Sequence, residues 1–282
     1  LHAHPFTDSQ IDRTVATLDR LGLEIPCLTS GCCLKFADKL DATKAELCEY
    51  IELAKKLSTP FIRVLADLEP APAGEIDDAY MANAIKEVAA AAKNSGVTLL
   101  IETNGVYSDT KRLRKLLDDV NLPQVAALWD MHHPYRFAHE KPEETVANLG
   151  SYIRYVHVKD SVILNNADGT ETIKYKMMGY GDMPIPEMLT ALSTIGYEGY
   201  ISLEWVKRWA PDIEDCGIVF PQFAAYMRQH RDDVKLPLQT SARGVGKYIW
   251  PKEHLIDCTF GALLDRICDE FPDQYAFRYT TL

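Results

Sequence analysis

The sequence predicts an α/β fold in which βα units surround a parallel sheet. Apolar runs of strand length recur along the chain, and stretches with helical periodicity separate them. Glycine indicates the same boundaries, because Gly96 and Gly196 each stand where a helix would end before a strand begins. The predicted strands are Ile25–Ser30, Phe61–Ala66, Thr98–Glu102, Val125–Asp130, Tyr152–Asp160 and Tyr200–Trp205.

The remaining elements follow from the same patterns. Residues 1–22 read as a loop and one helix, and apolar residues at helical spacing predict further helices over 47–57 and 85–92. One interval between strands, Ser161–Met178, is longer than the others and contains Asp168-Gly169 between two short apolar runs. Asp-Gly tolerates positive φ, so this interval predicts a hairpin flap. Six strands are visible where a closed barrel needs eight, so a barrel would lack its first two strands here.

The pattern changes after His230. Residues 232–254 mix proline, glycine, serine and basic residues without a clear period, as linkers do. Thr259 is a candidate helix cap, and apolar residues follow it at helical spacing. We therefore expect a domain at 1–231, a linker at 232–254 and the opening fragment of a second domain at 255–282, with the chain an excerpt of a longer protein.

Composition excludes several classes of partner. The chain has 282 residues, of which 47% are apolar and 25% are charged, and 30 basic residues against 41 acidic ones give a net charge of −11. This field repels phosphate backbones and anionic lipids, so neither nucleic acid nor membrane is expected as a partner. No apolar run approaches the length of a membrane span. The seven cysteines form no CxxC pair, which favours a reducing, cytoplasmic location.

The chemically informative residues stand at the carboxyl ends of the last four strands. These positions carry Glu102, Asp130, His157 and Glu204. Each residue alone is more often a helix cap, a loop acceptor or a core histidine, but in parallel α/β barrels this end of the strands builds the active site. Three converging carboxylates repel one another unless a cation joins them. Three oxygen ligands and one imidazole suit manganese, our first choice, or magnesium, cobalt or zinc.

Three further polar residues are candidate contacts for the carboxylates or for a substrate. Lys159 shares a strand face with His157, so its ammonium either approaches a substrate oxyanion or phosphate or pairs with Asp160. Arg63 is a charge within a short strand, and we expect it to point inward and pair with the carboxylates or with substrate. His132 follows the Asp130 strand and is a candidate contact for a polyol.

Five short motifs follow one another along the chain, and four of them contain the strand-end residues. They are Ile101-Glu102-Thr103-Asn104, Trp129-Asp130-Met131-His132-His133-Pro134-Tyr135, His157-Val158-Lys159-Asp160, Gly179-Tyr180-Gly181-Asp182 and Leu203-Glu204-Trp205. In this order they resemble the sugar phosphate isomerase/epimerase family, the xylose isomerase-like TIM-barrel group that includes ketose 3-epimerases and inosose dehydratases. The resemblance covers residues 1 to about 230 and implies a TIM (β/α)8-type barrel whose first two strands lie upstream of Leu1.

The resemblance also implies roles for individual residues. Glu102, Asp130, His157 and Glu204 would bind one divalent metal ion, and His133, in the D-x-x-H motif, would contact substrate. Such an ion polarises a substrate carbonyl and stabilises the enediolate that forms when the adjacent carbon loses its proton. Glu102 and Glu204 come from strands three apart, so they can approach opposite faces of a flat enediolate and act as bases.

The expected function is therefore a metal-dependent isomerase or epimerase of a small carbohydrate or polyhydroxy acid. An inosose-type dehydratase on the same metal site remains an alternative, and so does a non-catalytic barrel that regulates an attached ligase. A converging set of four ligands would favour the two enzymes. An arginine or lysine at its centre would favour the non-catalytic barrel.

The C-terminal segment carries a second, shorter resemblance. Residues 259–266 and 271–279 resemble the N-terminal edge of AMP-dependent acyl-CoA synthetases, which are adenylate-forming ligases. This implies a covalently fused ligase domain in the intact protein, of which the chain holds only the first helix and strand. The expected partner is thus a small sugar or polyol together with the fused ligase, and a homo-oligomer stays open.

Overall fold

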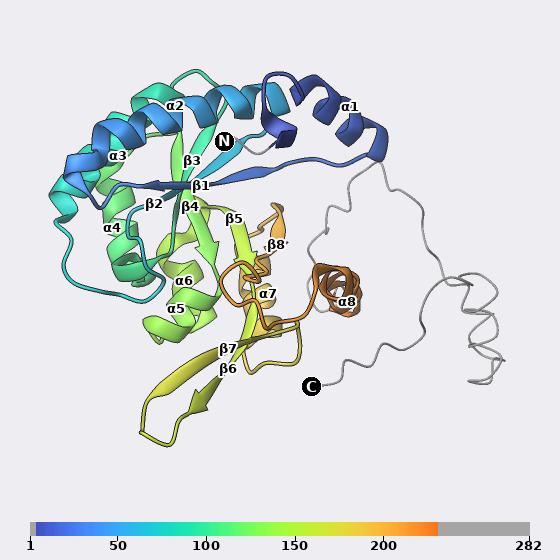
Figure 1. Cartoon of the computed structure of the whole chain (residues 1–282). Helices are drawn as coiled ribbons and strands as arrows, with labels where there is room; N and C mark the ends of the chain where they lie inside the picture. Colours follow the sequence, from blue (N-terminus) through green and yellow to red (C-terminus); the bar gives the residue numbers. More distant parts are fainter. Residues whose placement is uncertain (1–3, 231–282) are drawn as a thin grey trace, which may run out of the picture. The chain divides into compact units, whose positions relative to one another are not determined.

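The computed structural model describes residues 4–230 of the chain (Figure 1). Its centre is a curved parallel sheet of six strands in the order β1-β2-β3-β4-β5-β8, and a separate antiparallel pair, β6 and β7, forms a hairpin. The sheet is a partial TIM barrel, which confirms the predicted fold class. The strands are β1 Cys27–Cys33, β2 Phe61–Leu65, β3 Thr98–Glu102, β4 Val125–Asp130, β5 Ile153–Val158, β6 Asp160–Asn165, β7 Glu171–Lys176 and β8 Ile201–Leu203.

Helices follow the strands in the βα alternation that the sequence predicts. Among the described residues, the α-helices are α1 Ile11–Leu21, α2 Leu40–Leu57, α3 Asp78–Ala92, α4 Thr110–Val120, α5 His132–Phe137, α6 Pro142–Leu149, α7 Ile185–Thr194 and α8 Cys216–Gln229. The short 3-10 turns are η1 His4–Phe6, η2 Ala37–Lys39, η3 Gly105–Ser108 and η4 Gly150–Tyr152.

Strand boundaries agree with the prediction in the middle of the sheet and differ toward its edges. β3 and β4 have the predicted bounds, whereas the long strand predicted over Tyr152–Asp160 ends at Val158 and the chain enters the hairpin at Asp160. β1 extends three residues beyond Ser30, because an irregular register lets it resume pairing with β2 at Cys33. β8 is shorter than the predicted Tyr200–Trp205 and pairs with β5 alone among the sheet strands.

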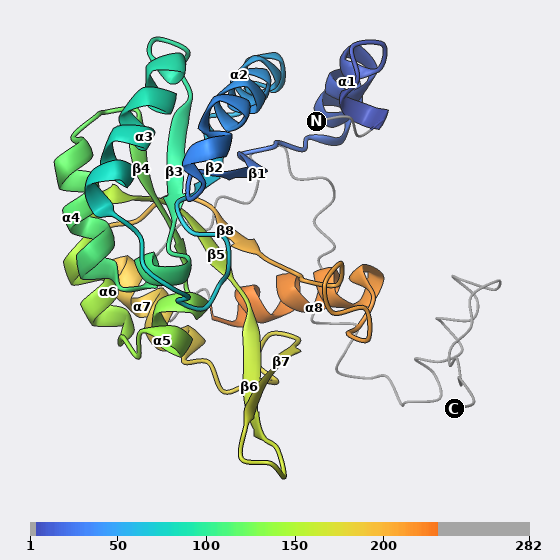
Figure 2. The same cartoon turned by 60° about the vertical axis from the view of Figure 1, so that its left-hand side comes forward.

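The helices α2, α3, α4 and α6 lie along the outer face of the sheet (Figures 1 and 2). In α2, the apolar residues Leu47, Ile51 and Ala54 are buried toward the sheet, as the helical spacing predicts. Helix α3 begins at a side-chain cap, since the carboxylate of Asp77 accepts hydrogen bonds from the backbone N–H groups of Ala79 and Tyr80. The main hydrophobic core lies between these helices and the sheet.

The inner face of the sheet is divided into an apolar floor and a polar rim. The floor consists of Leu100, Ala126, Leu128 and Tyr155, which form a cluster of their own. Because side chains alternate along a strand, the residue two positions after each of Leu100, Leu128 and Tyr155 points to the same face. Those residues are the acidic and imidazole side chains predicted to form the site. The fold thereby raises them together above the floor at the carboxyl ends of their strands.

The predicted flap is confirmed as the hairpin β6–β7, which projects from the rim in Figures 1 and 2. Its base is held by Asp160, whose carboxylate accepts hydrogen bonds of 2.9 Å from the backbone N–H groups of Gly179 and Gly181. The same carboxylate accepts from the N–H of Ser161 at 2.8 Å. One buried side chain therefore fastens both ends of the inserted segment.

The predicted linker at 232–254 and the fragment at 255–282 lie outside the described residues. Within residues 4–230, no helix is long and apolar enough to cross a membrane.

Candidate metal centre

Four side chains from four strands converge on the inner face. They are Glu102 at the end of β3, Asp130 at the end of β4, His157 in β5 and Glu204 immediately after β8. One ligand atom from each residue can be chosen so that all four lie within 4.8 Å of one another. The structure thus brings together the residues whose convergence the sequence predicts.

The separations between these atoms fit a divalent ion. Glu102 Oε1 lies 3.1 Å from His157 Nδ1, and that nitrogen lies 3.8 Å from Glu204 Oε1. Two ligand atoms that each lie about 2.1 Å from one ion are roughly 3.0 to 3.4 Å apart at octahedral or tetrahedral angles. Carboxylate oxygens with one imidazole are the donors that manganese, magnesium, cobalt and zinc accept. The donor set therefore fits such an ion in number and type, and the separation between Glu102 and His157 lies in the range that a shared ion requires, whereas that between His157 and Glu204 is a few tenths of an ångström longer.

Burial is uneven across the cluster. The side chains of Glu102, Asp130 and His157 are no more than 5% exposed, whereas that of Glu204 is 21% exposed. A small molecule would therefore reach the cluster from the side of Glu204.

Two protein cations contact the carboxylates. Arg63 Nη1 lies 3.0 Å from Glu102 Oε2, and its Nε donates to the carbonyl oxygen of Ser30 at 3.2 Å. Arg63 thus points inward and pairs with the carboxylate cluster, one of the two partners expected for it. The ammonium of the buried Lys159 donates to Asp130 Oδ2 and Glu204 Oε2.

The position of Lys159 contradicts its expected pairing with Asp160, and it also bears on whether the barrel is catalytic. Lys159 does not pair with Asp160, because neighbouring residues on an extended chain point to opposite sides and Asp160 is engaged by the backbone of Gly179 and Gly181. A lysine against the cluster was the feature expected of a non-catalytic barrel. However, Arg63 and Lys159 alone leave one of the three carboxylates uncompensated. Burial would lower the pKa of His157, but the hydrogen bond to Glu102 outweighs it and raises that pKa, so the imidazole supplies part of the missing positive charge and a divalent ion can supply the rest.

The same contacts keep the two glutamates ionised. Burial alone would raise the pKa of Glu102, but the hydrogen bond from His157 and the charge of Arg63 outweigh it and lower that pKa to about 2. Burial also opposes ionisation of Glu204, and the adjacent Lys159 ammonium more than compensates, so its pKa lies below the usual range. Both side chains are therefore carboxylates at neutral pH and can accept protons.

The two histidines after β4 differ in their surroundings. His133 Nδ1 donates to the carbonyl oxygen of Thr103 at 3.0 Å, which directs Nε2 toward Asp130 Oδ2 at 3.5 Å. His132 Nε2 instead lies 3.0 Å from Ser161 Oγ at the base of the hairpin. Its Nδ1 has no hydrogen-bond partner among residues 4–230. His133 therefore faces the cluster, while His132 joins α5 to the hairpin.

Two side chains near the site had no predicted role. Thr103 Oγ1 donates to the carbonyl oxygen of Asp130 at 3.1 Å and accepts from its N–H at 2.9 Å, which fixes the end of β4 against that of β3. Tyr175 of β7 places its ring 5.7 Å from that of His132. The alternation of side chains along a strand could not have indicated either contact. The first depends on how β3 and β4 pair, and the second on how β7 packs against α5.

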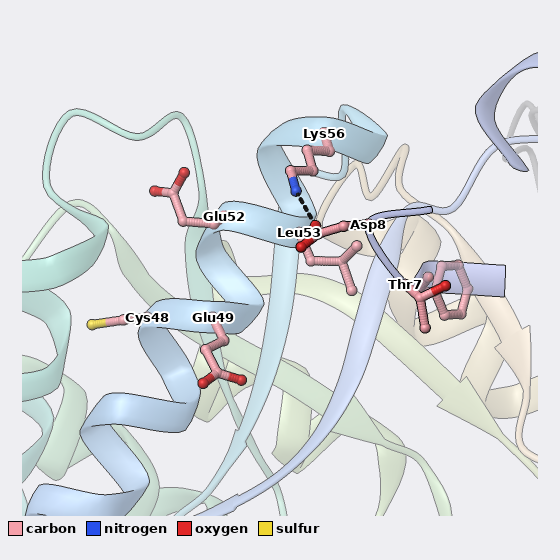
Figure 3. A pocket seen from close by; sticks show the side chains of 8 residues that line it. Thr7, Asp8, Cys48, Glu49, Glu52, Leu53 and Lys56 are labelled. Carbon is pink, nitrogen blue, oxygen red and sulfur yellow. Dashed lines mark hydrogen bonds and ion pairs between the residues drawn. The ribbon is translucent and has the colours of Figure 1, made fainter. Parts of the chain in front are cut away.

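A groove elsewhere on the molecule is lined by exposed charged side chains instead of a buried cluster. It lies between the N-terminal segment and α2 and has a volume of about 540 Å³. Figure 3 shows the side chains that line it. Its Lys56 is paired with Asp8 at 2.9 Å, and Glu49 and Glu52 are exposed. These solvated charges do not converge as the residues at the strand ends do, so the cluster above the floor is the candidate site.

Comparison with known families agrees with this geometry. A family model described as the xylose isomerase-like TIM barrel matches residues 2–219. The chain belongs to the xylose isomerase-like TIM barrel family. The matched range includes every member of the four-residue cluster, together with Arg63, His132, His133 and Lys159.

Curated relatives of this xylose isomerase-like chain are distant. YihM of Escherichia coli K12, itself uncharacterized, is 28% identical over 181 residues, which cover 63% of the chain and 50% of YihM. Fructoselysine 3-epimerase of Escherichia coli O157:H7 is 28% identical over 134 residues, covering 46% of each protein. The chain thus spans about half the length of the curated relatives it matches.

Solved structures share the fold of this xylose isomerase-like barrel at low identity. D-psicose 3-epimerase of Clostridium cellulolyticum H10, solved with D-tagatose, has a TM-score of 0.65 and 19% identity over 81% of this chain and 85% of that one. A Mycobacterium smegmatis barrel in complex with magnesium has a TM-score of 0.63 and 17% identity over 79% and 78%. A probable 3-DHS dehydratase of Bacillus anthracis has a TM-score of 0.63 and 18% identity over 78% and 82%.

Proposed function

We propose that this chain carries the active site of a metal-dependent isomerase or epimerase that acts on a small carbohydrate or polyhydroxy acid. The convergence of Glu102 and Glu204 carries the proposal. Both are ionised carboxylates, and they reach one site from β3 and β8, which stand three places apart in the sheet. The similarity to a fructoselysine 3-epimerase and to the fold of a D-psicose 3-epimerase supports the same reaction class.

Glu102, Asp130, His157 and Glu204 would hold the ion, with manganese as first choice and magnesium, cobalt or zinc as alternatives. When bound, the ion supplies electrostatic stabilisation to a substrate carbonyl whose oxygen gains negative charge. Arg63 holds the outer oxygen of Glu102, so Oε1 stays directed toward the cluster. His133 is the proposed contact for a substrate hydroxyl, and His132 supports the hairpin beside it.

The two glutamates divide the proton transfer. Glu102 removes the proton from the carbon next to the carbonyl, and the electron pair left behind is delocalised as an enediolate. Glu204, reaching the opposite face, takes up a proton from solvent and delivers it to the same carbon, which inverts its configuration, while Glu102 releases the proton that it removed to solvent. Return of the proton to the neighbouring carbon would instead interconvert an aldose and a ketose.

Dehydration is the second candidate, and Lys159 is the observation that favours it. Its ammonium lies against Glu204, where its positive charge can stabilise the negative charge that develops on a departing hydroxyl group. The fold is shared with a probable 3-DHS dehydratase. The position of Lys159 against the cluster is the observation among residues 4–230 that favours a non-catalytic barrel, whereas the ligase fragment that it would regulate lies outside the described residues.

Solvent deuterium incorporation tests the proposal. The protein, loaded in turn with manganese and magnesium, is incubated in deuterated water with a panel of ketoses, sugar acids and inososes. We expect metal-dependent exchange of one carbon-bound proton, with an epimer or isomer as product, and loss of exchange in Glu102→Gln. Glu52→Gln, an exposed change on α2, serves as control. Metal binding without exchange on any substrate would contradict the proposal, and loss of water would identify a dehydratase.

A further inference from the structure

The two cations of the site contact their carboxylates in different ways. Arg63 takes the outer oxygen of Glu102, Oε2, and leaves Oε1 to face His157. Lys159 instead lies between two ligands, because its ammonium contacts both Asp130 and Glu204. Arg63 therefore supports one ligand from behind, whereas Lys159 occupies space between two ligands.

The two oxygens of the Asp130 carboxylate have different partners. Asp130 Oδ1 accepts a hydrogen bond of 2.9 Å from the backbone N–H of His132. Oδ2 is the oxygen that contacts Lys159 and lies nearest His133 Nε2. An ion that takes Asp130 as a ligand through Oδ2 must share that oxygen with a fixed positive charge.

We propose that Lys159 is a positioning residue that competes with the divalent ion for Asp130 and Glu204. The ammonium holds these two carboxylates together across β5, and an ion that binds them must overcome its charge. This inference rests on the metal dependence in the proposed function. It implies that the site binds its ion less tightly than its four ligands would without the lysine, because like charges a few ångströms apart repel.

The test is the metal affinity of Lys159→Met, which keeps the length of the side chain and removes its charge. We expect manganese to bind this variant at least about tenfold more tightly in a calorimetric titration. With chelator present, its melting temperature should fall below that of the wild type, because Asp130 and Glu204 then repel each other. Addition of manganese should raise the melting temperature of the variant by more than that of the wild type.

Two further variants separate competition from a merely structural role. Lys35→Met removes another lysine paired with a buried carboxylate, Lys35 Nζ to Asp67 Oδ1 at 2.7 Å, outside the cluster. It should lower the melting temperature and leave the manganese affinity unchanged. Lys159→Arg restores the charge and should return the affinity to within about threefold of the wild type.

Each other result has a definite meaning. Equal or weaker manganese binding by Lys159→Met overturns the inference and leaves the proposed function intact. Failure of both the wild type and the variant to bind any divalent ion overturns both. A variant that folds only when the ion is added supports the inference, since the ion then supplies the missing charge, whereas one that is unfolded with and without the ion contradicts it.

Discussion

Arg63 and Glu102 form an ion pair of 3.0 Å between the adjacent strands β2 and β3, on the inner face of the sheet. Glu102 is buried and Arg63 is half-buried, and Arg63 also donates to the carbonyl oxygen of Ser30 on β1. Three neighbouring strands are thereby tied to one acidic side chain of the site. The orientation of Glu102 depends on an arginine that precedes it by 39 residues.

Loss of this arginine should destabilise the protein. Arg63→Gln leaves the Glu102 carboxylate buried with one partner fewer, and we expect a loss of roughly 3 kcal/mol in the free energy of unfolding by urea. Arg114→Gln is the control, because Arg114 pairs with Asp118 on the exposed surface of α4 and its loss should cost less than about 1 kcal/mol. Equal losses in the two variants would show that the Arg63–Glu102 pair contributes no more to the free energy of unfolding than an exposed ion pair does.

Glu204→Gln should separate proton removal from proton return. If Glu102 removes the proton and Glu204 returns one, this variant still exchanges substrate hydrogen with deuterated solvent but forms epimer roughly 100-fold more slowly or worse. The measurement is mass spectrometry of recovered substrate and product, with metal content determined in the same sample. Product formation at the wild-type rate would remove Glu204 from the mechanism.

The protein should lose stability in acid through the cluster of Asp78, Arg112 and Tyr107. Although burial opposes ionisation of Asp78, hydrogen bonds from Arg112 and Tyr107 lower its pKa below the ordinary value of 3.8. In the unfolded chain Asp78 protonates near that value, so its contribution is present above it and lost as pH falls through the folded pKa. Melting curves from pH 2.5 to 6 should show a smaller acid-induced decrease for Asp78→Asn than for the wild type.

The cluster of Asp78, Arg112 and Tyr107 should also make the stability of the protein depend on pH in the alkaline range. Burial first, and then the Asp78 carboxylate 2.9 Å from its hydroxyl, raise the pKa of Tyr107 above 10. Its contribution is full below that value and disappears as pH rises through the folded pKa. Tyr107→Phe should therefore lower stability at pH 7 and flatten the alkaline limb of the melting profile.

Gly181 is required by the Asp160 anchor. A Cβ atom at this position would collide with the Asp160 carboxylate and lie 2.5 Å from the Ser161 carbonyl oxygen. We expect Gly181→Ala to cost about 1–3 kcal/mol in urea unfolding. Gly217→Ala, at a helical position with nothing within 4 Å of the added atom, should leave stability unchanged or slightly higher. Equal stabilities of the two variants would contradict the anchoring role.

The sequence predicted the site best where the position of a side chain depends on its own strand alone. Strand ends and period-two alternation place Glu102, Asp130 and His157 on one face without knowledge of the partners, and β3 and β4 have the predicted bounds. The partner of Lys159 could not be obtained in this way. Its contacts with Asp130 and Glu204 depend on the approach of β4 and β8 from either side of β5.

The same limit explains the other omissions. Thr103 had no predicted role because its hydroxyl group meets the backbone of Asp130 only when β3 and β4 align in register. The anchor of Asp160 depends on the return of the chain at Gly179 after the hairpin. Local patterns thus identify the groups that converge in the candidate site, whereas the contacts that orient those groups are properties of the assembled sheet.

The Asp160 anchor makes the hairpin an exchangeable part. Because the carboxylate fastens the segment at both of its ends, the residues between Ser161 and Met178 can change in length and composition while the strands that carry the cluster stay in place. Hairpins grafted from other members of the family onto this base would then change the side chain that packs beside His132, which is Tyr175 here, and the proposed proton-transfer groups would remain those of this chain. The hairpin can therefore vary in sequence while the barrel and its cluster stay unchanged.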